Sequence, residues 1–527
     1  MILFLLDKRT EERIRLLFQA EGLPSLDLKG ITKQIFMANS TSKTIKGLST
    51  QTVVTISMGI LEIILFSIMS RLLSKDDFGY YAAISAVVLI FSSFSETGIG
   101  AAIIQKKTIS KRFIDNAFTL SFLFGSLLTV LMFALSGVLA DVLIDKTAAL
   151  PLRLMSITLL LNCLTSVNLS IIYRKLHFKI AGIVNLSSLV LTSIIAVLLA
   201  IKGYGYYAII AKAVLVSVIS FLFSFYYAKT KYNLALDKET CSSIFKFSGW
   251  LMASVVFRNI SHQIDRLLMP KLLSVSQLGA YNRPKDFVGN ISNKLNGIFD
   301  TALFPVLSSL QDNPKSLNSA FEKSFYYLNL LSTLLSLTFI VNSSLIIHIF
   351  FGNRWLYLQP ILCIFSLSII FNADGRLADC YLRSLAMTKQ QLFFRIAETV
   401  IKTLCVIFAA RFDISGVAIS IVSSDILIKI IKILYVSRKL NFDTMRVFRI
   451  LIDSWRCLLV LIPISFVFFI IVPPTVYGNV VLLLLFLTFV LAIFFAFPSF
   501  VGSLYYHNVY PQIKSFLLIL KIKIQEK

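Results

Sequence analysis

The strongest constraint in this sequence is a phrase that occurs twice, 200 positions apart. Residues 71–81 read RLLSKDDFGYY and residues 271–281 read KLLSVSQLGAY, with five identical positions in eleven and no gap. Internal repeats in a membrane protein usually mark two halves that move against each other around a central binding site. The repeat therefore predicts a chain built from two related bundles.

The composition indicates a membrane protein. The chain is 57% apolar and 15% charged, with a mean hydropathy of +0.81. Apolar runs recur along it, and a run of about 20 residues crosses the ~30 Å hydrocarbon core as a helix. These runs lack the period-two alternation of membrane-barrel strands. The predicted fold class is therefore an all-α polytopic membrane protein with about 14 transmembrane helices.

The first six spans correspond to the next six, and two extra helices follow at the C-terminus. Because six is an even number, both halves have the same orientation and form two lobes around a central cavity. The predicted spans are 49–70, 78–99, 116–140, 151–173, 180–201, 205–228, 246–269, 277–305, 325–350, 358–382, 390–410, 414–437, 455–473 and 477–500.

This pattern divides the chain into six parts. The parts are 1–48, a cytoplasmic N-terminal segment; 49–230, the first lobe; 231–245, a cytoplasmic inter-lobe loop; 246–437, the second lobe; 438–500, a cytoplasmic loop and the last two helices; and 501–527, a basic cytoplasmic tail. Within the first part, residues 1–36 allow two interpretations. Either the start site is placed too early and Met37 is the true start, or these residues form a short cytoplasmic amphipathic arm.

The formal net charge of +24 fits a membrane topology. Most Lys and Arg residues lie in the N-terminal segment, the loops after even-numbered spans and the C-terminal tail. Such loops face the cytoplasm, which places both termini there. Nucleic-acid binding is excluded because no long basic soluble segment exists.

Motifs for chemistry are absent from the sequence. The six cysteines are scattered without CxxC spacing, and the four histidines are far apart. No disulfide framework or metal site is therefore expected. Neither a phosphate-binding GxxxxGK[ST] loop nor a hydrolase or kinase motif occurs. We expect no catalytic residue, no cofactor and no nucleotide.

The eighth span, residues 277–305, is too charged to be predicted from hydropathy alone. The repeat argues for it, because its counterpart at 78–99 is plainly apolar. On a helical wheel, one face of about 120° collects its polar residues, which predicts a helix with one wet face. These residues are Asn282, Arg283, Asp286, Asn290, Asn293, Lys294, Gly297 and Asp300.

Further charged faces occur in the second half. A charge inside a bilayer is costly, so such residues line cavities or pair with one another. Two interpretations stay open: a basic, water-filled cavity for an anionic headgroup, or structural ion pairs such as Asp265 with Arg258 or Asp379 with Arg383. The faces comprise Arg258, His262 and Asp265 in span 7; Asn372, Arg376, Asp379 and Arg383 in span 10; and Arg395, Glu398 and Lys402 in span 11.

The first half is drier. Glu62 lies mid-span in helix 1 and Glu96 near the end of helix 2. A lone buried carboxylate is a candidate proton or cation site. The alternative is a Glu satisfied by polar neighbours, with Lys212 as one possible ion-pair partner for either.

Three segments resemble one known family. They are SRLLSKDDFGYYAAISAVVLIFSSFSETGIGAAIIQKK (70–107), ISHQIDRLLMPKLLSVSQLGAYNRPKDF (260–287) and FPVLSSLQDNP (304–314). They resemble the polysaccharide-transporter branch of the multidrug/oligosaccharidyl-lipid/polysaccharide flippase superfamily, close to its colanic-acid-exporter type. Residues 1–36 and the charged NRPKDF segment depart from the family pattern.

The resemblance implies a MATE-like flippase of the bacterial inner membrane. It would carry a polyprenyl-diphosphate-linked oligosaccharide (an O-antigen, capsule or exopolysaccharide unit) between leaflets by alternating access. Besides membrane lipid, implied partners are a glycan polymerase and chain-length proteins. The expected site residues are Arg258, Arg283, Lys294 and Arg376 for the diphosphate; Asn290 and Asn293 for sugar hydroxyls; His262 and Arg383 elsewhere in the lining; and Glu62, Asp265 and Glu96 as ion-coupling candidates.

Three rival functions remain. A cation-coupled exporter of drugs or metabolites on the same fold would need acidic and aromatic lining, whereas this lining is net basic. A membrane-embedded glycan polymerase or ligase would need a long extracytoplasmic loop, which the predicted spans do not leave. A non-transporting scaffold would not need a charged face on the eighth span.

Overall fold

The computed structural model is mainly helical in the residues it describes. These are 41–452, apart from the short segments 96–98, 106–108, 176, 311–312, 386, 440–444 and 446–447. The predicted spans 455–473 and 477–500, the basic tail and the question of residues 1–36 lie outside the described residues. The description below therefore concerns the two predicted lobes.

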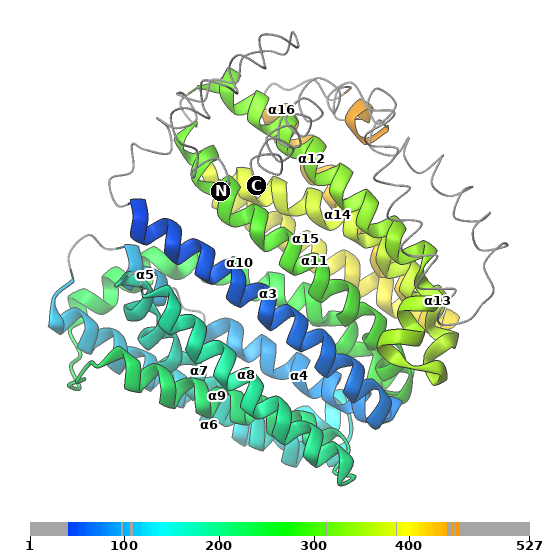
Figure 1. The fold of residues 1–527 in the computed structure, drawn as a ribbon, viewed down its shortest axis with the longest axis horizontal. Helices are drawn as coiled ribbons and strands as arrows, with labels where there is room; N and C mark the ends of the chain where they lie inside the picture. The colour runs from blue at the N-terminus through cyan, green and yellow to red at the C-terminus, as the bar shows by residue number, and fades with distance from the viewer. Residues whose placement is uncertain are drawn as a thin grey trace, which may run out of the picture.

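The first group of helices packs around α7 (Figure 1). Helix α7 lies against α6 and α9, α8 packs on α9, and α3 covers α8. We call this group the first lobe. Its helices are α3 (Thr41–Leu72), α4 (Lys75–Ser95), α5 (Ile99–Gln105), α6 (Lys111–Leu143), α7 (Ala149–Arg174), α8 (Phe178–Ile201) and α9 (Tyr206–Ala228), with the short η2 (Lys146–Ala148) before α7.

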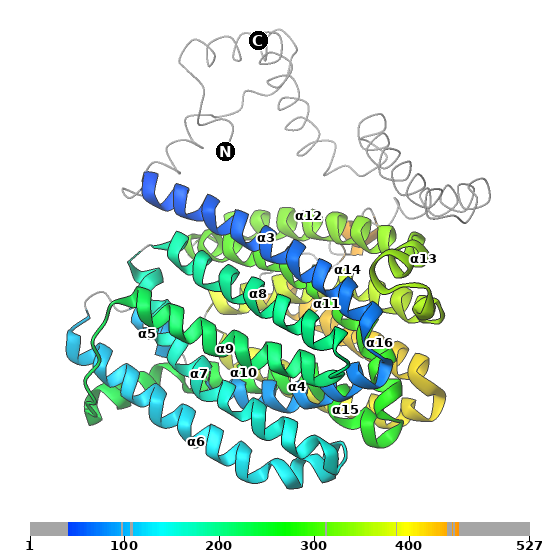
Figure 2. The ribbon, with the colours of Figure 1, turned by 60° about the horizontal axis from the view of Figure 1, so that its bottom comes forward.

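The second group packs around α14, which contacts α11, α12 and α16, while α15 bridges α10 and α16. Figure 2 shows α12 and α14 of this second lobe at the top and α15 at the lower right, with α3 crossing in front. Its long helices are α10 (Lys238–Leu272), α11 (Val275–Ser309), α12 (Pro314–Val341), α14 (Gln359–Ser384), α15 (Thr388–Ala409) and α16 (Asp413–Lys439); its short ones are α13 (Ser343–Ile346), η3 (Ile347–Phe351), η4 (Asn353–Leu358) and η5 (Ala410–Phe412).

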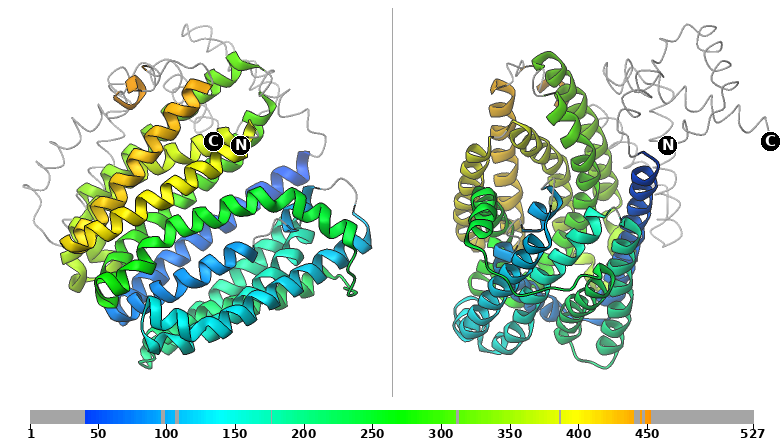
Figure 3. Two further views of the ribbon diagram at one scale, coloured as in Figure 1. Left: turned by 180° about the vertical axis from the view of Figure 1, so that it is seen from behind. Right: turned by 90° about the vertical axis from the view of Figure 1, so that its left-hand side faces the viewer.

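Eight of the described helices are long and apolar enough to cross a membrane, namely α3, α4, α6, α7, α8, α9, α12 and α14. The outer face of α6 illustrates why: Leu127, Val130 and Val138 are each at least 60% exposed, as lipid-facing residues are. The helices α10, α11, α15 and α16 are comparably long but carry the charged residues that the sequence placed on polar faces. In the left view of Figure 3, α10 (green), α15 (yellow) and α16 (orange) lie side by side in that order on the face turned to the viewer.

A helix, α11, does occupy the eighth predicted span, and its crossing of the membrane stays a prediction. It runs from Val275 to Ser309 and packs against α4 and α14 along its length. Hydropathy misses it because its polar residues face cavities inside the protein, where water rather than lipid solvates them.

The repeated phrase has the same local role in both copies. The hydroxyl of Ser74 accepts a hydrogen bond from the backbone N–H of Asp77 at 3.2 Å, and that of Ser274 from Gln277 at 3.1 Å. Each serine therefore caps the helix that follows it, α4 or α11, by satisfying a free N–H of the first turn.

The two copies also meet each other. Gly79 lies so close to α11 that a Cβ there would stand 1.9 Å from the carbonyl oxygen of Val275. A Cβ on Gly279 would stand 1.8 Å from that of Lys75. Only glycine allows two helix backbones to approach this closely. We call this glycine contact between α4 and α11 the seal.

The segment after α13 forms a further contact between the two lobes, beside the seal. Trp355 of η4 donates through Nε1 to the carbonyl oxygen of Ser70 at 3.0 Å, and Arg354 donates to the carbonyl oxygens of Ser70 and Leu73. These carbonyls end α3 and have no partner within the helix. The second lobe thus caps the last turn of α3 in the first.

The connection between the lobes lies along α6. The backbone N–H groups of Asn233, Ala235 and Asp237 donate to the side chains of Asp115, Thr119 and Asn116 at 3.2, 3.1 and 2.7 Å. The inter-lobe connection is therefore held by the first lobe as far as the start of α10.

Tyr232 anchors the middle of this connection. Its ring stacks on Phe118 with centroids 3.9 Å apart, and its hydroxyl donates to Asn168. Burial raises the pKa of Tyr232 to about 12, so the hydroxyl stays neutral and remains a donor.

Candidate functional site

Two adjoining cavities lie at the centre of the described structure. The interlobe cavity, of about 500 Å³, lies between α3, α4, α7 and α9 of the first lobe and α10 and α11 of the second. Its wall includes Glu62, Lys212 and Arg283. It therefore occupies the place where the repeat predicts a central site.

The second-lobe cavity, of about 640 Å³, is enclosed by α10, α11, α14, α15 and α16, with one residue from α4. Both cavities share Leu89, Arg266, Asp286 and Asn290 in their walls, so they meet at this point. Both volumes lie in the range of small-molecule binding sites. Together they form one polar interior reaching from the lobe interface into the second lobe.

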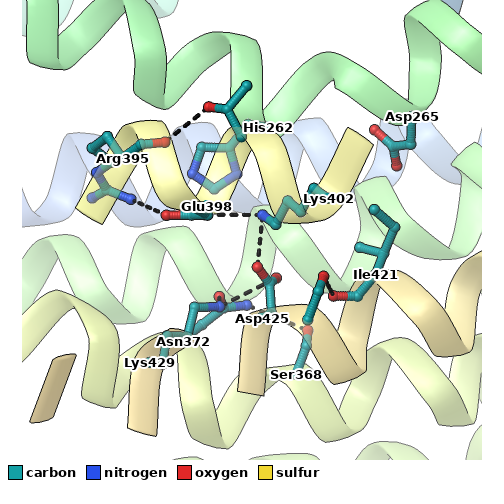
Figure 4. Close-up of polar contacts among 12 residues, drawn as sticks. His262, Asp265, Ser368, Asn372, Arg395, Glu398, Lys402, Ile421, Asp425 and Lys429 are labelled. Atoms are coloured by element: carbon teal, nitrogen blue, oxygen red, sulfur yellow. Dashed lines mark hydrogen bonds and ion pairs between the residues drawn. The ribbon is translucent and has the colours of Figure 1, made fainter. Parts of the chain in front are cut away.

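A chain of buried ion pairs lies along one wall of the second-lobe cavity, and Figure 4 shows its part from Arg395 through Asp425 to Lys429. Asp379 of α14 pairs with Arg395 of α15, and with Lys432 of α16 at 2.9 Å. The other arm of Arg395 donates to Glu398 at 2.9 Å. Three helices are thus tied together by one carboxylate and its two cations.

The chain of ion pairs continues toward the far end of the cavity. Glu398 pairs with Lys402 at 2.9 Å, and Lys402 with Asp425 at 2.6 Å. Asp425 then pairs with Lys429 at 3.2 Å, and Lys429 also donates to Asn372. We call these seven charged residues the ion-pair chain: Asp379, Arg395, Glu398, Lys402, Asp425, Lys429 and Lys432. Four are cations and three are carboxylates, so the chain carries one surplus positive charge.

The two interpretations of the charged faces prove compatible, because the charges both pair and line a cavity. The suggested pairs themselves are wrong. Asp265 accepts from Lys285, and from the Tyr281 hydroxyl at 2.5 Å. Asp379 pairs with Arg395 and Lys432, while Arg383 donates to the backbone oxygen of Asp379 at 3.4 Å.

Five predicted lining residues do face the second-lobe cavity: Arg258, His262, Asn293, Arg376 and Arg383. Arg376 donates to Asn293, which joins α14 to α11 across the cavity wall. His262 points from α10 toward the ion-pair chain (Figure 4). Asn290 faces both cavities.

The other predicted residues have different surroundings. Arg283 lines the interlobe cavity but is bound to α3, and Lys294 pairs with Glu62 at 2.7 Å across the lobe interface. Asp265 is buried beside Lys285. Glu96 lies outside the described residues, as does the side chain of Asp300.

The sequence interpretation missed the charged face of α16. Asp425, Lys429 and Lys432 follow one another at i, i+4 and i+7, the same spacing as Arg258, His262 and Asp265 in span 7. Residues at these spacings share one helix face. The same rule, applied to residues 414–437, would have found them.

We expect Glu62→Gln to have little effect on stability. The side chains of Glu62 and Lys294 are 38% and 34% exposed, and exposed ion pairs typically contribute about 0–1 kcal/mol. Thermal unfolding of Glu62→Gln, Lys294→Met and the double variant would measure the pair directly. If Glu62→Gln by itself lowered the free energy of unfolding by several kcal/mol, this expectation of a weak ion pair would be wrong.

The model of the polysaccharide biosynthesis protein family matches residues 68–360, which is more than half of the chain. The chain belongs to this family. The resemblance seen in its sequence is thereby confirmed.

Among curated relatives of this family member is the lipopolysaccharide biosynthesis protein WzxC of Escherichia coli K12. It is 22% identical over 363 residues, covering 68% of this chain and 73% of WzxC. The teichuronic acid biosynthesis protein TuaB of Bacillus subtilis 168 is 24% identical, covering 64% of this chain and 71% of TuaB. The succinoglycan biosynthesis transport protein ExoT of Rhizobium meliloti 1021 is 22% identical, covering 58% and 62%.

Solved structures share the fold. The lipid II flippase MurJ in an inward closed conformation aligns with a TM-score of 0.67 at 16% identity, over 85% of this chain and 98% of MurJ. An inward-facing multidrug transporter of the MATE family aligns with a TM-score of 0.61 at 13% identity, over 74% and 98%. The MATE-like fold of a multi-pass membrane protein is thus confirmed, while the count of 14 helices stays a prediction.

Proposed function

We propose that this family member is a flippase for a polyprenyl-diphosphate-linked oligosaccharide. It takes the headgroup into the two adjoining cavities from the cytoplasmic leaflet of a bacterial inner membrane and releases it at the other leaflet by alternating access. Both termini face the cytoplasm in this proposal. The names of the relatives WzxC, TuaB and ExoT, all proteins of polysaccharide biosynthesis, support it.

The observation that carries the proposal is the charge of the second-lobe cavity. Cations outnumber carboxylates two to one among the lining residues that the structure describes, so this wall is net basic. An anionic, hydrated headgroup would be complementary in charge to such a wall. The cations are Arg258, Arg266, Lys285, Arg376, Arg383, Arg395, Lys429 and Lys432; the carboxylates are Asp286, Asp379, Glu398 and Asp425.

Individual roles follow from position. Arg376 and Arg258 face the cavity and would contact phosphate oxygens, which a guanidinium binds through two parallel hydrogen bonds. Asn290 and Asn293 would bind sugar hydroxyls through their amides. His262 and Arg383 complete the wall, and the lipid chain would stay in the bilayer.

A cation-coupled drug exporter on the same fold fits less well. A cationic substrate would face repulsion from this surplus of positive charge. Ion coupling is still compatible with flipping, with Glu62 and Asp265 as the described candidates. A glycan polymerase and chain-length proteins remain proposed partners, since they would act on the flipped product.

The direct test is transport of a fluorescent polyprenyl-diphosphate oligosaccharide in proteoliposomes. We expect the purified protein to move it between leaflets, and Arg376→Gln to slow this by about tenfold, the loss of a charge-assisted contact worth ~1.4 kcal/mol. Arg153→Gln is the matched control, because Arg153 lies in α7 outside both cavity walls. A wild-type protein that leaves the lipid in its original leaflet would refute the proposal.

A further inference from the structure

Arg283 of α11 inserts into a slot on the first lobe. Its Cζ lies 3.6 Å from the ring centre of Phe66 on α3 and 3.8 Å from that of Phe78 on α4. One terminal nitrogen donates to the carbonyl oxygen of Phe66 at 3.0 Å and to the hydroxyl of Ser70. This side chain of the second lobe is therefore clamped by two helices of the first.

The charge of Arg283 has no negative partner in this slot. No carboxylate among the described residues lies within ion-pair distance of it, and its Nε has no hydrogen-bond partner. The nearest acid along the helix, Asp286, is held by Arg266 and Asn282. A buried guanidinium held only by neutral acceptors and aromatic rings keeps unused donors and a high affinity for anions.

The position of Arg283 links the cavity to the seal. Its side chain lines the interlobe cavity, and it follows Gly279 by one helical turn on α11. Ser70, which it contacts, is also bound by Arg354 and Trp355 at the end of α3. One side chain thus faces the space where a headgroup would bind and contacts the residues that keep the lobes together.

We propose that Arg283 is the residue through which an anion in the interlobe cavity opens the seal. The proposal rests on the proposed function for its ligand, a phosphate group. Phosphate oxygens form stronger hydrogen bonds with a guanidinium than the neutral Phe66 carbonyl and Ser70 hydroxyl do. The anion therefore draws Arg283 out of the slot, and this difference in affinity between the two states shifts the lobes toward separation.

The test measures exposure of a cysteine placed in the seal. Ala280, next to Gly279 and 4% exposed, is replaced by Cys in a variant lacking the native cysteines, and the protein is placed in nanodiscs. We expect a soluble maleimide to react slowly with this background and about tenfold faster when Arg283→Gln is added. Arg153→Gln is the matched control, because Arg153 lies in α7 outside both cavity walls.

Ligands test the second half of the proposal. A polyprenyl diphosphate and inorganic pyrophosphate should both accelerate labelling of the background protein, and neither should accelerate labelling of Arg283→Gln. The neutral polyprenol should have no effect. Should Arg283→Gln fail to fold, Arg283→Lys serves instead, since a lysine keeps the charge but loses the planar fork that fills the slot.

The outcomes separate this inference from the proposed function. Equal labelling rates with and without Arg283→Gln would overturn the inference, as would acceleration by neither phosphate compound. Acceleration by pyrophosphate but not by the polyprenyl diphosphate would support the role of Arg283 and count against the lipid-linked substrate.

Discussion

Asp379→Asn is expected to destabilise the folded protein by about 3–5 kcal/mol, the usual cost of removing one partner from a buried ion pair. Asp379 is 7% exposed and neutralises both Arg395 and Lys432. Without its charge, Arg395 keeps Glu398 as an ion-pair partner, whereas Lys432 has no other carboxylate within ion-pair distance among the residues that the structure describes. The midpoint of thermal or denaturant-induced unfolding in detergent would measure the loss.

The matched control removes a cation together with the carboxylate. The double variant Asp379→Asn/Lys432→Met should regain part of the lost stability, since one uncompensated charge is then absent. Glu62→Gln provides the comparison, because it neutralises a carboxylate in a partly exposed ion pair that contributes little to stability. A single variant Asp379→Asn as stable as the wild type would show that water in the second-lobe cavity solvates these cations, and the ion-pair chain would lose its structural role.

The sequence predicted the helices of both lobes well, including the one that hydropathy rejects. The sequence predicts a helix over 277–305, because the repeat aligns these residues with the apolar span 78–99. The helix observed there, α11, runs from Val275 to Ser309. Periodicity also predicted which side chains share a face, and Asn290, Asn293 and Arg376 do line the cavities.

Pairing between helices could not be predicted in the same way. A helical wheel shows which residues of one helix lie together, but not which neighbouring helix they meet. The sequence suggests Arg258, on the same helix, as the ion-pair partner of Asp265, whereas Asp265 pairs with Lys285 of α11. Arg283 was interpreted as a free ligand for phosphate, and only tertiary packing brings it between two phenylalanine rings.

The two copies of the repeated phrase share one part of their role and differ in another. In each copy of the phrase the serine caps a helix and the glycine contacts the other lobe. Beyond the glycine the copies diverge: Ala83 of α4 is buried and apolar, where α11 has Arg283. The symmetric part of the repeat therefore forms the contact between the lobes, while its asymmetric part supplies the polar cavity wall.

Gly279→Ala is expected to break the seal while leaving each lobe folded. The added Cβ would lie 1.8 Å from the carbonyl oxygen of Lys75 and 2.7 Å from the backbone nitrogen of Gly79, whereas ordinary contacts begin at 3.4 Å. Both neighbours are backbone atoms of a helix and cannot rotate away. Overpacking of this kind typically costs about 1–3 kcal/mol, and separation of α4 from α11 relieves it.

The steric clash is relieved only when the two lobes separate. Gly279→Ala should therefore shift the protein from its closed to its open conformation more than it destabilises the fold. The Ala280 position should become reactive without any ligand, and transport should fall by about tenfold or more, since the closed state would be depopulated. Gly289→Ala is the matched control on the same helix, where a Cβ would meet nothing within 4 Å. If Gly279→Ala transported normally and left the seal unreactive, α4 and α11 would have room that this structure does not give them, and the glycines would not hold the lobes together.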